Sequence, residues 1–422
     1  MGVRKRRSDA ITHAIARALD NENDRRAKSW GKAIGHFFDL FSLFHLDLTR
    51  QQYADFHAMR HDFWDIDDGD YSSSFYSQPH AADAAEQDPR PANKPEQQHR
   101  QHLPKLEPAG NLGYSGSSFF HTSDGKYLVK SLDRASESDF FIKELFDPYT
   151  THMKTHPSSL LVRITDMLYA PRATMGTILR IQPRHYIIME NLLQGMGNDQ
   201  QAGHADGAAK WQTFDLKPDD YFFPERDVAG GRLASTQVID GLVDEFPDQV
   251  HAPPLVKQEL LDILLEDTKF LARSNVVDYS LFLARFPKAE LKAGSASAGS
   301  ASAGVEEAEE AEEAEEADDQ LAATTALVAP SWRAGVPSTD GKWIYRAVLL
   351  DFLWAKHKLR AQAMTGLVGA FNLLFRKTEP MSITTDPGEY QARFMSMVER
   401  VLSRPDEGTQ GGGSAARSVA HE

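Results

Sequence analysis

Hydrophobic residues recur with a period of two in several short segments of the chain. The segments "SFFHT" (118–122) and "KYLVKSL" (126–132) flank an Asp124-Gly125 pair, which predicts a β-hairpin with a two-residue turn. "RHYIIMENLL" (184–193) and "WQTFDLK" (211–217) also have the length and apolar content of strands. The chain between residues 110 and 290 therefore contains β-sheet.

Other segments carry apolar residues at helical spacing. Helices are predicted in "SESDFFIKELFDPYTTHMKTH" (136–156), in "LVKQELLDILLEDTKFLARSN" (255–275) and around "EYQARFMSMVERVL" (389–402). Near the N-terminus, "WGKAIGHFFDLFSLFHLDL" (30–48) predicts an amphipathic helix. It has few basic residues on its polar face, which favours packing on the protein core over lying on a membrane. The mixture of helices and strands indicates an α+β protein.

Low-complexity segments divide the chain. A segment rich in Pro, Gln and His (79–105) predicts a mobile connection, and a Gly/Ala/Ser repeat followed by a Glu/Ala repeat predicts a disordered acidic insert at 292–330. We expect an N-terminal extension (1–45), one domain of two lobes (46–403) that carries the insert, and a flexible tail (404–422).

Composition narrows the class of protein. With 422 residues and 41% hydrophobic residues, the chain can bury a substantial core. No apolar run approaches the ~20 residues that a membrane-spanning helix needs. The net charge of −15 comes largely from the acidic insert, so it says little about any binding face. The absence of cysteine excludes disulfides and thiolate chemistry and is typical of an intracellular protein.

Four features together suggest phosphoryl transfer. The loop in "GYSGSSFF" (113–120) could hold phosphates, because glycines let the backbone approach them and free N–H groups supply donors. Lys130 follows on a predicted strand, and Asp278 and Asp351 each interrupt an apolar run. Taken singly, each is more often a surface hairpin, a surface lysine or a capping aspartate. Their order matches that of kinases, although the sequence contains no Walker A, H-R-D or D-F-G motif.

With these motifs, the chain resembles the phosphatidylinositol phosphate kinase family. The resemblance rests on the loop "GYSGSSFF", the strand "YLVKSL", the hinge-like "YIIMENLL", "FDLK" (214–217), "DTKFLARSNVVDYSLFL", "VLLDFLW" and "MSITTDPGEYQARFMSMV". "FWDIDDGDYSSSF" (63–75) is similar to the stretch that opens the family's catalytic domain. The family implies a two-lobed SAICAR synthase-like fold with antiparallel sheets and flanking helices, the N-lobe at about 46–190 and the C-lobe at about 191–403.

The resemblance also implies a site for ATP and Mg²⁺. The ATP contacts would be Gly113, Ser115, Gly116 and Ser117 at the phosphates, Lys130 with Glu137 as its partner at the α- and β-phosphates, and Glu190, Asn191 and Leu192 at the adenine. Asp351 would bind Mg²⁺. Asp278 would orient the inositol hydroxyl, and Lys217 would lie near the transferred phosphate or the headgroup. The headgroup would meet Arg226 or Arg232, and Arg360.

The activity that this resemblance implies is transfer of the ATP γ-phosphate to a phosphatidylinositol monophosphate, of the 4-phosphate 5-kinase type. The protein would work in the cytoplasm and transiently at membranes, without nucleic acid, and homodimerisation is left open. Two alternatives remain. "DLKPDD" (215–220) replaces the family's D-L-K-G-S, and "HKLRAQAM" (357–364) has lost basic residues, which favours a nucleotide-binding pseudoenzyme or scaffold. An ATP-using enzyme with a soluble substrate would suit the weak basic surface.

Overall fold

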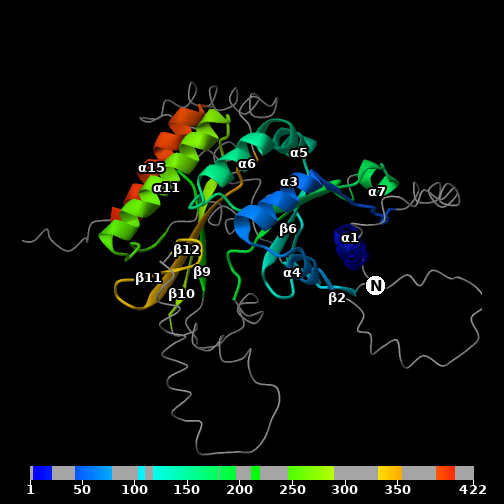
Figure 1. Ribbon diagram of the computed structural model, residues 1–422, viewed down its shortest axis with the longest axis horizontal. Helices are drawn as coiled ribbons and strands as arrows, with labels where there is room; N and C mark the ends of the chain where they lie inside the picture. The colour runs from blue at the N-terminus through cyan, green and yellow to red at the C-terminus, as the bar shows by residue number, and fades with distance from the viewer. Residues whose placement is uncertain are drawn as a thin grey trace, which may run out of the picture.

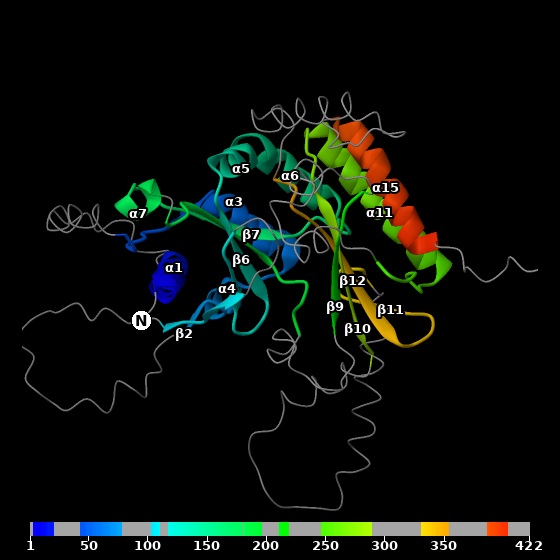
Figure 2. The same cartoon turned by 180° about the vertical axis from the view of Figure 1, so that it is seen from behind.

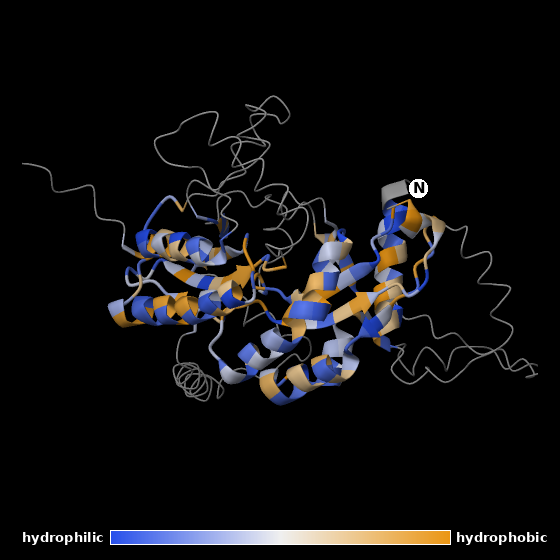
Figure 3. Cartoon of the chain, turned by 90° about the horizontal axis from the view of Figure 1, so that it is seen from above, coloured by the Kyte–Doolittle hydropathy of each residue, from blue (hydrophilic) through white to orange (hydrophobic). Residues whose placement is uncertain are grey.

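The computed structural model describes residues 3–20, 43–77, 103–109, 117–179, 181–195, 211–218, 246–288, 331–353 and 386–403. Within these residues the chain forms two main antiparallel sheets with helices packed on them (Figure 1). Seen from above, the two sheets and their helices form two groups that lie beside each other (Figure 3). The expected α+β class is confirmed.

The first sheet has six strands in the order β1-β7-β8-β6-β5-β4. Its strands are β1 (Thr49–Gln51), β4 (Leu106–Ala109), β5 (Phe119–Thr122), β6 (Tyr127–Leu132), β7 (Ile164–Tyr169) and β8 (His185–Glu190). The helical elements near it are α1 (Val3–Asp20), α3 (Tyr53–Ala58), the π-helix η1 (Met59–Phe63), α4 (Asp68–Ser73), α5 (Ala135–Phe140), the π-helix η2 (Phe141–Leu145), α6 (Phe146–Thr155) and α7 (Met175–Ile178). A small ribbon pairs β2 (Tyr76–Ser77) with β3 (Leu103–Pro104).

Both faces of the first sheet are covered, which explains why "RHYIIMENLL" is a continuous apolar run rather than an alternating one. In β8, Ile187 and Met189 join the core that includes the α5 to α6 helices, whereas Tyr186 and Ile188 join the core against α1. Figures 1 and 2 show these helices on opposite sides of the sheet. The helix α1 lies where the sequence indicated only a basic start. Most of the amphipathic helix expected at 30–48 lies outside the described residues, and its described end, 43–48, is not helical but extends into β1.

The second sheet has four strands in the order β11-β12-β10-β9. Its strands are β9 (Gln212–Leu216), β10 (Ser280–Pro287), β11 (Val336–Pro337) and β12 (Trp343–Leu350), and the helices on it are α11 (Pro254–Arg273) and α15 (Pro387–Ser403). The two helices lie side by side in both views (Figures 1 and 2). The helices predicted at 136–156, 255–275 and 389–402, and the strands predicted at 184–193 and 211–217, are confirmed, with ends that differ by a few residues.

The predicted hairpin is present, but its turn is longer than two residues. β5 ends at Thr122 and β6 begins at Tyr127. Asp124 organises the loop between them, because its carboxylate accepts hydrogen bonds from the Thr122 hydroxyl at 2.5 Å and from the Lys126 N–H at 3.1 Å. Gly125 has a φ of +71°, a conformation that favours glycine. The Asp-Gly signal therefore located the turn correctly and underestimated its length.

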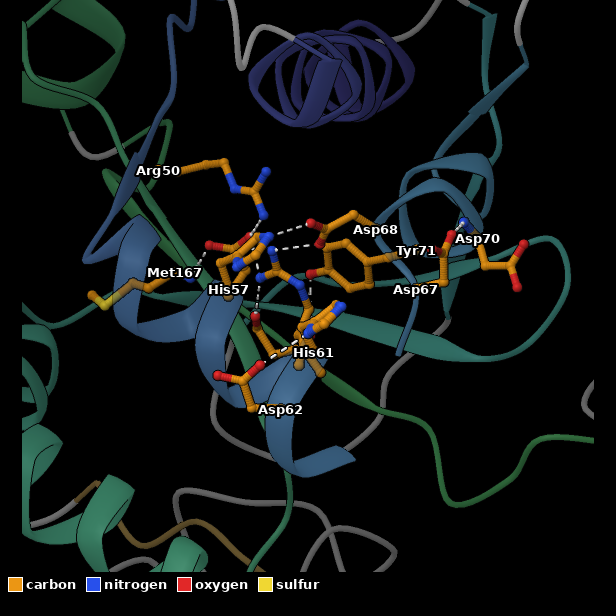
Figure 4. Close-up of polar contacts among 12 residues, drawn as sticks. Arg50, His57, His61, Asp62, Asp67, Asp68, Asp70, Tyr71 and Met167 are labelled. Atoms are coloured by element: carbon orange, nitrogen blue, oxygen red, sulfur yellow. Dashed lines mark hydrogen bonds and ion pairs between the residues drawn. The ribbon is translucent and has the colours of Figure 1, made fainter. Parts of the chain in front are cut away.

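A buried charge network joins the segment before residue 77 to the first sheet (Figure 4). The carboxylate of Asp166, on β7, lies 2.5 Å from Arg50 Nη2 and 3.3 Å from Arg60 Nη1. Arg60 also donates to the Thr165 carbonyl at 2.8 Å and to Asp68 at 3.2 Å. Burial raises the pKa of Asp166, and the two guanidinium groups oppose that shift. The network fixes β1 and the helices that follow it against β7.

A second buried polar contact connects α6 to α11. His152 Nε2 lies 2.7 Å from Asp267 Oδ1, and the other oxygen of Asp267 accepts the Leu160 N–H at 2.7 Å. The His152 ring stacks on Phe270 with centroids 4.4 Å apart. Asp267 is 1% exposed, so water cannot readily take the place of its oxygens as acceptors for these two donors.

Asp267→Ala should therefore destabilise the fold. The substitution leaves the Leu160 N–H and the His152 ring nitrogen without this acceptor, at a cost of about 1–3 kcal/mol for each buried donor. We expect a lower denaturant midpoint in urea unfolding followed by circular dichroism. Asp262→Ala, on the exposed side of the same helix, is the matched control and should leave the midpoint in place. Equal midpoints for the two variants would contradict the prediction.

Candidate active site

The residues predicted for the site meet where β6 of the first sheet approaches β12 of the second. Lys130 is the fourth residue of β6, paired across the sheet with Phe119 and Ile187. Its side chain is 14% exposed and its Nζ lies 2.5 Å from Asp351 Oδ1. Asp351 directly follows β12, at the end of that strand. An ion pair between residues 221 positions apart thus joins the two sheets.

Lys130 and Asp351 each shift the pKa of the other group in the direction that favours its charged form. Burial lowers the pKa of Lys130, but the charges of Asp351 and Glu137 outweigh burial and keep that pKa above its ordinary value. Burial raises the pKa of Asp351, but Lys130 and Lys217 outweigh it and hold that pKa below its ordinary range. Both groups are therefore charged near neutral pH. Because the Asp351 carboxylate is 43% exposed, solvent weakens the pair, and its value lies in placement more than in stability.

A second lysine–aspartate pair lies next to the first. Lys217 follows β9, and its Nζ donates to the Asp278 carboxylate and, at 3.0 Å, to the Asp278 carbonyl. Burial lowers the pKa of Lys217, but the charges of Asp278, Asp215 and Asp351 raise it above its ordinary value. Since Lys217 acts electrostatically on both Lys130 and Asp351, the two pairs belong to one site.

The backbone at both aspartates has an uncommon conformation. Asp278 has a φ of +70° and Asp351 a φ of +61°, in the left-handed region that Asp and Asn tolerate better than other non-glycine residues. Such conformations cost free energy and often occur at functional sites. Asp351 directly follows β12, and Asp278 lies two residues before β10.

Contacts between two sequence motifs, "DYSL" and "EYQARF", hold Asp278 in place. Tyr279, the next residue, packs against Tyr390 and Phe394 with ring centroids 4.7 and 5.0 Å apart. The Tyr390 hydroxyl donates to the Tyr279 carbonyl at 2.5 Å. The tyrosine of "DYSL" and the tyrosine of "EYQARF" thus meet in the core between β10 and α15. This contact orients the chain that carries Asp278.

The glycine-rich loop is only partly within the described residues. Gly113, Ser115 and Gly116 lie outside them, and Ser117 lies at the start of the next described segment. The Ser117 side chain hydrogen-bonds to Asp133, just beyond the end of β6. The Ser118 N–H donates to the Ser131 hydroxyl at 2.8 Å. The C-terminal end of the loop is therefore attached to the strand that carries Lys130.

The expected Lys130–Glu137 pair is replaced by other contacts. Glu137 pairs at 3.2 Å with Arg134, the residue that precedes helix α5, and Asp351 is the hydrogen-bond partner of Lys130. Burial raises the pKa of Glu137, and Arg134 and Lys130 oppose the shift. The carboxylate is thus close enough to Lys130 to act on its charge, but it does not accept its hydrogen bond in this structure.

Three residues were expected at the adenine. Glu190 is the last residue of β8, and Asn191 and Leu192 begin the link that leads to the second sheet. The Glu190 carboxylate forms an ion pair with Arg333 and accepts the Arg163 N–H at 2.8 Å. Asn191 donates to the Gly125 carbonyl at 2.8 Å. Leu192 forms a small buried hydrophobic cluster with Ala284 and Val348 of the second sheet. These side chains are engaged in contacts within the protein.

Some predicted residues cannot be placed, and some contacts were missed. Arg226, Arg232 and Arg360 lie outside the described residues. The sequence did not point to Arg333, which belongs to no motif. Arg346 interrupts the apolar strand "WIYRAVLL", and that interruption was the signal by which the sequence could have pointed to Arg346.

Among the described residues, no three His, Cys, Asp or Glu side chains are grouped to hold a metal ion, and no helix has the length and apolarity to cross a bilayer.

Comparison with known proteins identifies the class. Residues 101–401 match the family model described as phosphatidylinositol-4-phosphate 5-kinase. A phosphatidylinositol 4-phosphate 5-kinase of Plasmodium falciparum (isolate 3D7) is 27% identical over 170 residues, which are 40% of this chain and 9% of that protein. A probable phosphatidylinositol phosphate kinase of Dictyostelium discoideum is 24% identical over 189 residues, 44% of this chain and 23% of that protein. Over these ranges the chain is therefore similar to lipid kinases.

The family itself can be stated more closely. Because the matched range covers more than half of the 422 residues, the chain belongs to the phosphatidylinositol-4-phosphate 5-kinase family. The matched part spans less than a quarter of the length of either curated relative. The first sheet extends beyond the matched range, since β1 pairs with β7 although it precedes residue 101.

Proposed function

We propose that the protein transfers the γ-phosphate of ATP to an inositol hydroxyl of a phosphatidylinositol monophosphate, as a 4-phosphate 5-kinase. The observation that carries the proposal is the Lys130–Asp351 ion pair, which joins the strand after the glycine-rich loop to an aspartate at the end of β12. In this proposal the two sheets correspond to the N- and C-lobes of the SAICAR synthase-like fold. The protein would act in the cytoplasm and at the membrane surface.

The side chains have complementary roles in this reaction. Lys130 holds the α- and β-phosphates of ATP, and Ser117 lies at the end of the loop that covers them. Lys217 lies beside Asp278 and stabilises the negative charge of the transferred phosphate. Asp278 orients the inositol hydroxyl and accepts its proton, as the aspartates of kinase catalytic loops do. Positioning and charge neutralisation supply most of the rate enhancement in such reactions.

The charged groups fit a magnesium ion bound together with substrate. Mg²⁺ is commonly held by one or two carboxylates plus substrate phosphates, so a group of three protein ligands is not required. Asp351 offers a partly exposed carboxylate with a lowered pKa at the place where the phosphates would lie. When bound, Mg²⁺ would neutralise the phosphate oxygens. Arg226 or Arg232, together with Arg360, are the proposed contacts of the lipid phosphate.

The test is ADP release by the purified protein with each phosphatidylinositol monophosphate in vesicles and, separately, with soluble inositol phosphates. We expect turnover with lipid, highest with phosphatidylinositol 4-phosphate, and loss of turnover in Lys130→Ala because the variant cannot hold the nucleotide phosphates. ATP binding without turnover on any substrate would favour a pseudoenzyme, in line with "DLKPDD". Turnover only with soluble compounds would favour an enzyme with a soluble substrate.

A further inference from the structure

Two arginines of the second-sheet region bind the link between the two sheets. This link begins at Glu190, the last residue of β8. Arg346, in the middle of β12, donates to the carbonyl of Leu192 at 3.0 Å and to that of Gln194 at 2.7 Å. Its Nε donates to the Ala334 carbonyl at 3.0 Å. The Arg346 guanidinium group thus connects the link after β8 to the segment before β11.

Arg333 binds the start of the same link. It forms an ion pair with the Glu190 carboxylate and donates to the carbonyls of Ser159 and Leu161 at 2.5 and 3.0 Å. The side chain is 15% exposed, and burial lowers its pKa, as does the charge of Arg163. Its planar fork therefore reaches the end of β8 and the segment that leads into β7. We name Arg333 and Arg346 the arginine clamp.

The clamp is attached to the strands that carry the site. The Trp332 carbonyl accepts the Ala347 N–H at 2.7 Å, so the segment bearing Arg333 is fixed to β12. Farther along β12, the Leu349 N–H donates to the Leu160 carbonyl at 2.7 Å. Asp351 follows at the end of this strand. In the first sheet, β8 pairs directly with β6, where Ile187 lies opposite Lys130. The clamp is therefore connected to Asp351 through β12 and to Lys130 through the pairing of β8 with β6.

We propose that Arg333 and Arg346 are positioning residues, which lock the link after β8 to the second sheet and so set the separation of Lys130 and Asp351. The proposal rests on the proposed phosphoryl transfer for its kinetic consequence, but its structural part stands on the contacts alone. Arginine suits this task because its rigid fork can bind a carboxylate and two carbonyls in fixed directions, which a lysine cannot. The two sheets also share a hydrophobic core, and Leu349 exchanges backbone hydrogen bonds with the segment before β7, so loss of the clamp should loosen their relative placement without separating them.

The structural test measures the distance between the two sheets in solution. The chain has no cysteine, so Glu107→Cys on β4 and Ala392→Cys on α15, both exposed, provide the only two sites for spin labels. Double electron–electron resonance should give a narrow distance distribution in the otherwise unchanged protein and at least a twofold broader one in Arg333→Met. Arg333→Lys should lie between them. If Arg333→Met fails to fold, Arg333→Lys and Glu190→Gln carry the comparison.

The matched control is Arg285→Met. Arg285 is also a buried arginine, but it bonds to Gln212 at 2.6 Å and to Asp248 at 3.4 Å, close to its own strand β10. We expect it to lower stability and leave the distance distribution narrow. A distribution in Arg333→Met as narrow as in the parent would overturn the clamp. Equal broadening in Arg285→Met would overturn it too, because broadening would then reflect general loosening.

The kinetic test uses ADP release. Because misplacement of reacting groups by about 1 Å can cost about 100-fold in rate, we expect Arg333→Met to lower kcat by about 10- to 100-fold with little change in the KM for lipid. Arg333→Lys should recover part of kcat, and Arg285→Met should retain it. An unchanged kcat in Arg333→Met would overturn the positioning role. A parent protein without turnover would overturn the proposed function, while a broadened distribution in Arg333→Met would still support the clamp.

Discussion

Asp278→Asn should lower the rate of ADP release by about 10²- to 10⁴-fold while the protein stays folded, because it removes the carboxylate that we propose as the acceptor of the inositol hydroxyl proton. The variant keeps the size of the side chain, although it also removes the carboxylate that pairs with Lys217. Asparagine tolerates the left-handed conformation at this position, where φ is +70°. The hydrogen bond from Lys217 Nζ to the carbonyl of residue 278 does not involve the carboxylate and can persist.

Asp65→Asn is the matched control for this prediction. Asp65 is an exposed aspartate with a φ of +53°, so the same change of side chain is made in the same backbone conformation outside the proposed site. We expect it to retain full turnover. ATP affinity, measured by calorimetry, should change little in Asp278→Asn, because Asp278 is assigned to the acceptor hydroxyl. If Asp278→Asn turned over lipid at the rate of Asp65→Asn, the assignment of Asp278 would be wrong.

The sequence was sufficient to find the individual parts of the site. The Asp-Gly turn located the β5–β6 hairpin, and the polar interruptions of apolar runs located Asp278 and Asp351. Their meeting could not be read from spacing, because Lys130 and Asp351 lie on different sheets and 221 positions apart. Resemblance led us to expect Glu137 beside Lys130. Arg134, the residue before α5, competes for that carboxylate, and hydrophobic periodicity contains no information on such a choice.

Other features left no usable pattern in the sequence. Arg333 follows the acidic insert within a short segment, and its partners are mostly backbone carbonyls, which every residue has. The helix α1 was overlooked because its basic first turn hides an apolar face that includes Ile11, Ile15 and Leu19. Burial of these side chains depends on the sheet beneath them. Local sequence therefore predicted elements, whereas long-range contacts decided which charged groups became partners.

Asp166→Asn should destabilise the protein more than any surface substitution. Asp166 is fully buried, and its carboxylate is the shared acceptor for Arg50 and Arg60. Asparagine has nearly the same size but no charge, so two buried guanidinium groups lose their common counter-charge. Loss of one partner from such a buried network costs about 3–5 kcal/mol. That is a large part of the ~5–15 kcal/mol by which a typical protein is stable.

The position of this network explains why it matters for the site. Arg50 and Arg60 precede the range that matches the family model, whereas Asp166 lies on β7 inside it. β7 pairs with β8, and β8 pairs with the strand of Lys130. The charges thus attach the early segment to the same sheet that carries the proposed ATP lysine. Weakening them should loosen β1 and α3 first, since these elements hold the edge of the sheet.

The measurement is the free energy of unfolding from urea titration, followed by circular dichroism and by tryptophan fluorescence. Trp64, which lies just after the π-helix η1, reports on the early segment, although other tryptophans contribute. Asp62→Asn is the control, because Asp62 is 58% exposed and pairs with the exposed His61. It should cause no resolvable change, since exposed pairs contribute little. Equal stability of Asp166→Asn and Asp62→Asn would show that the buried charges do not hold the early segment in place.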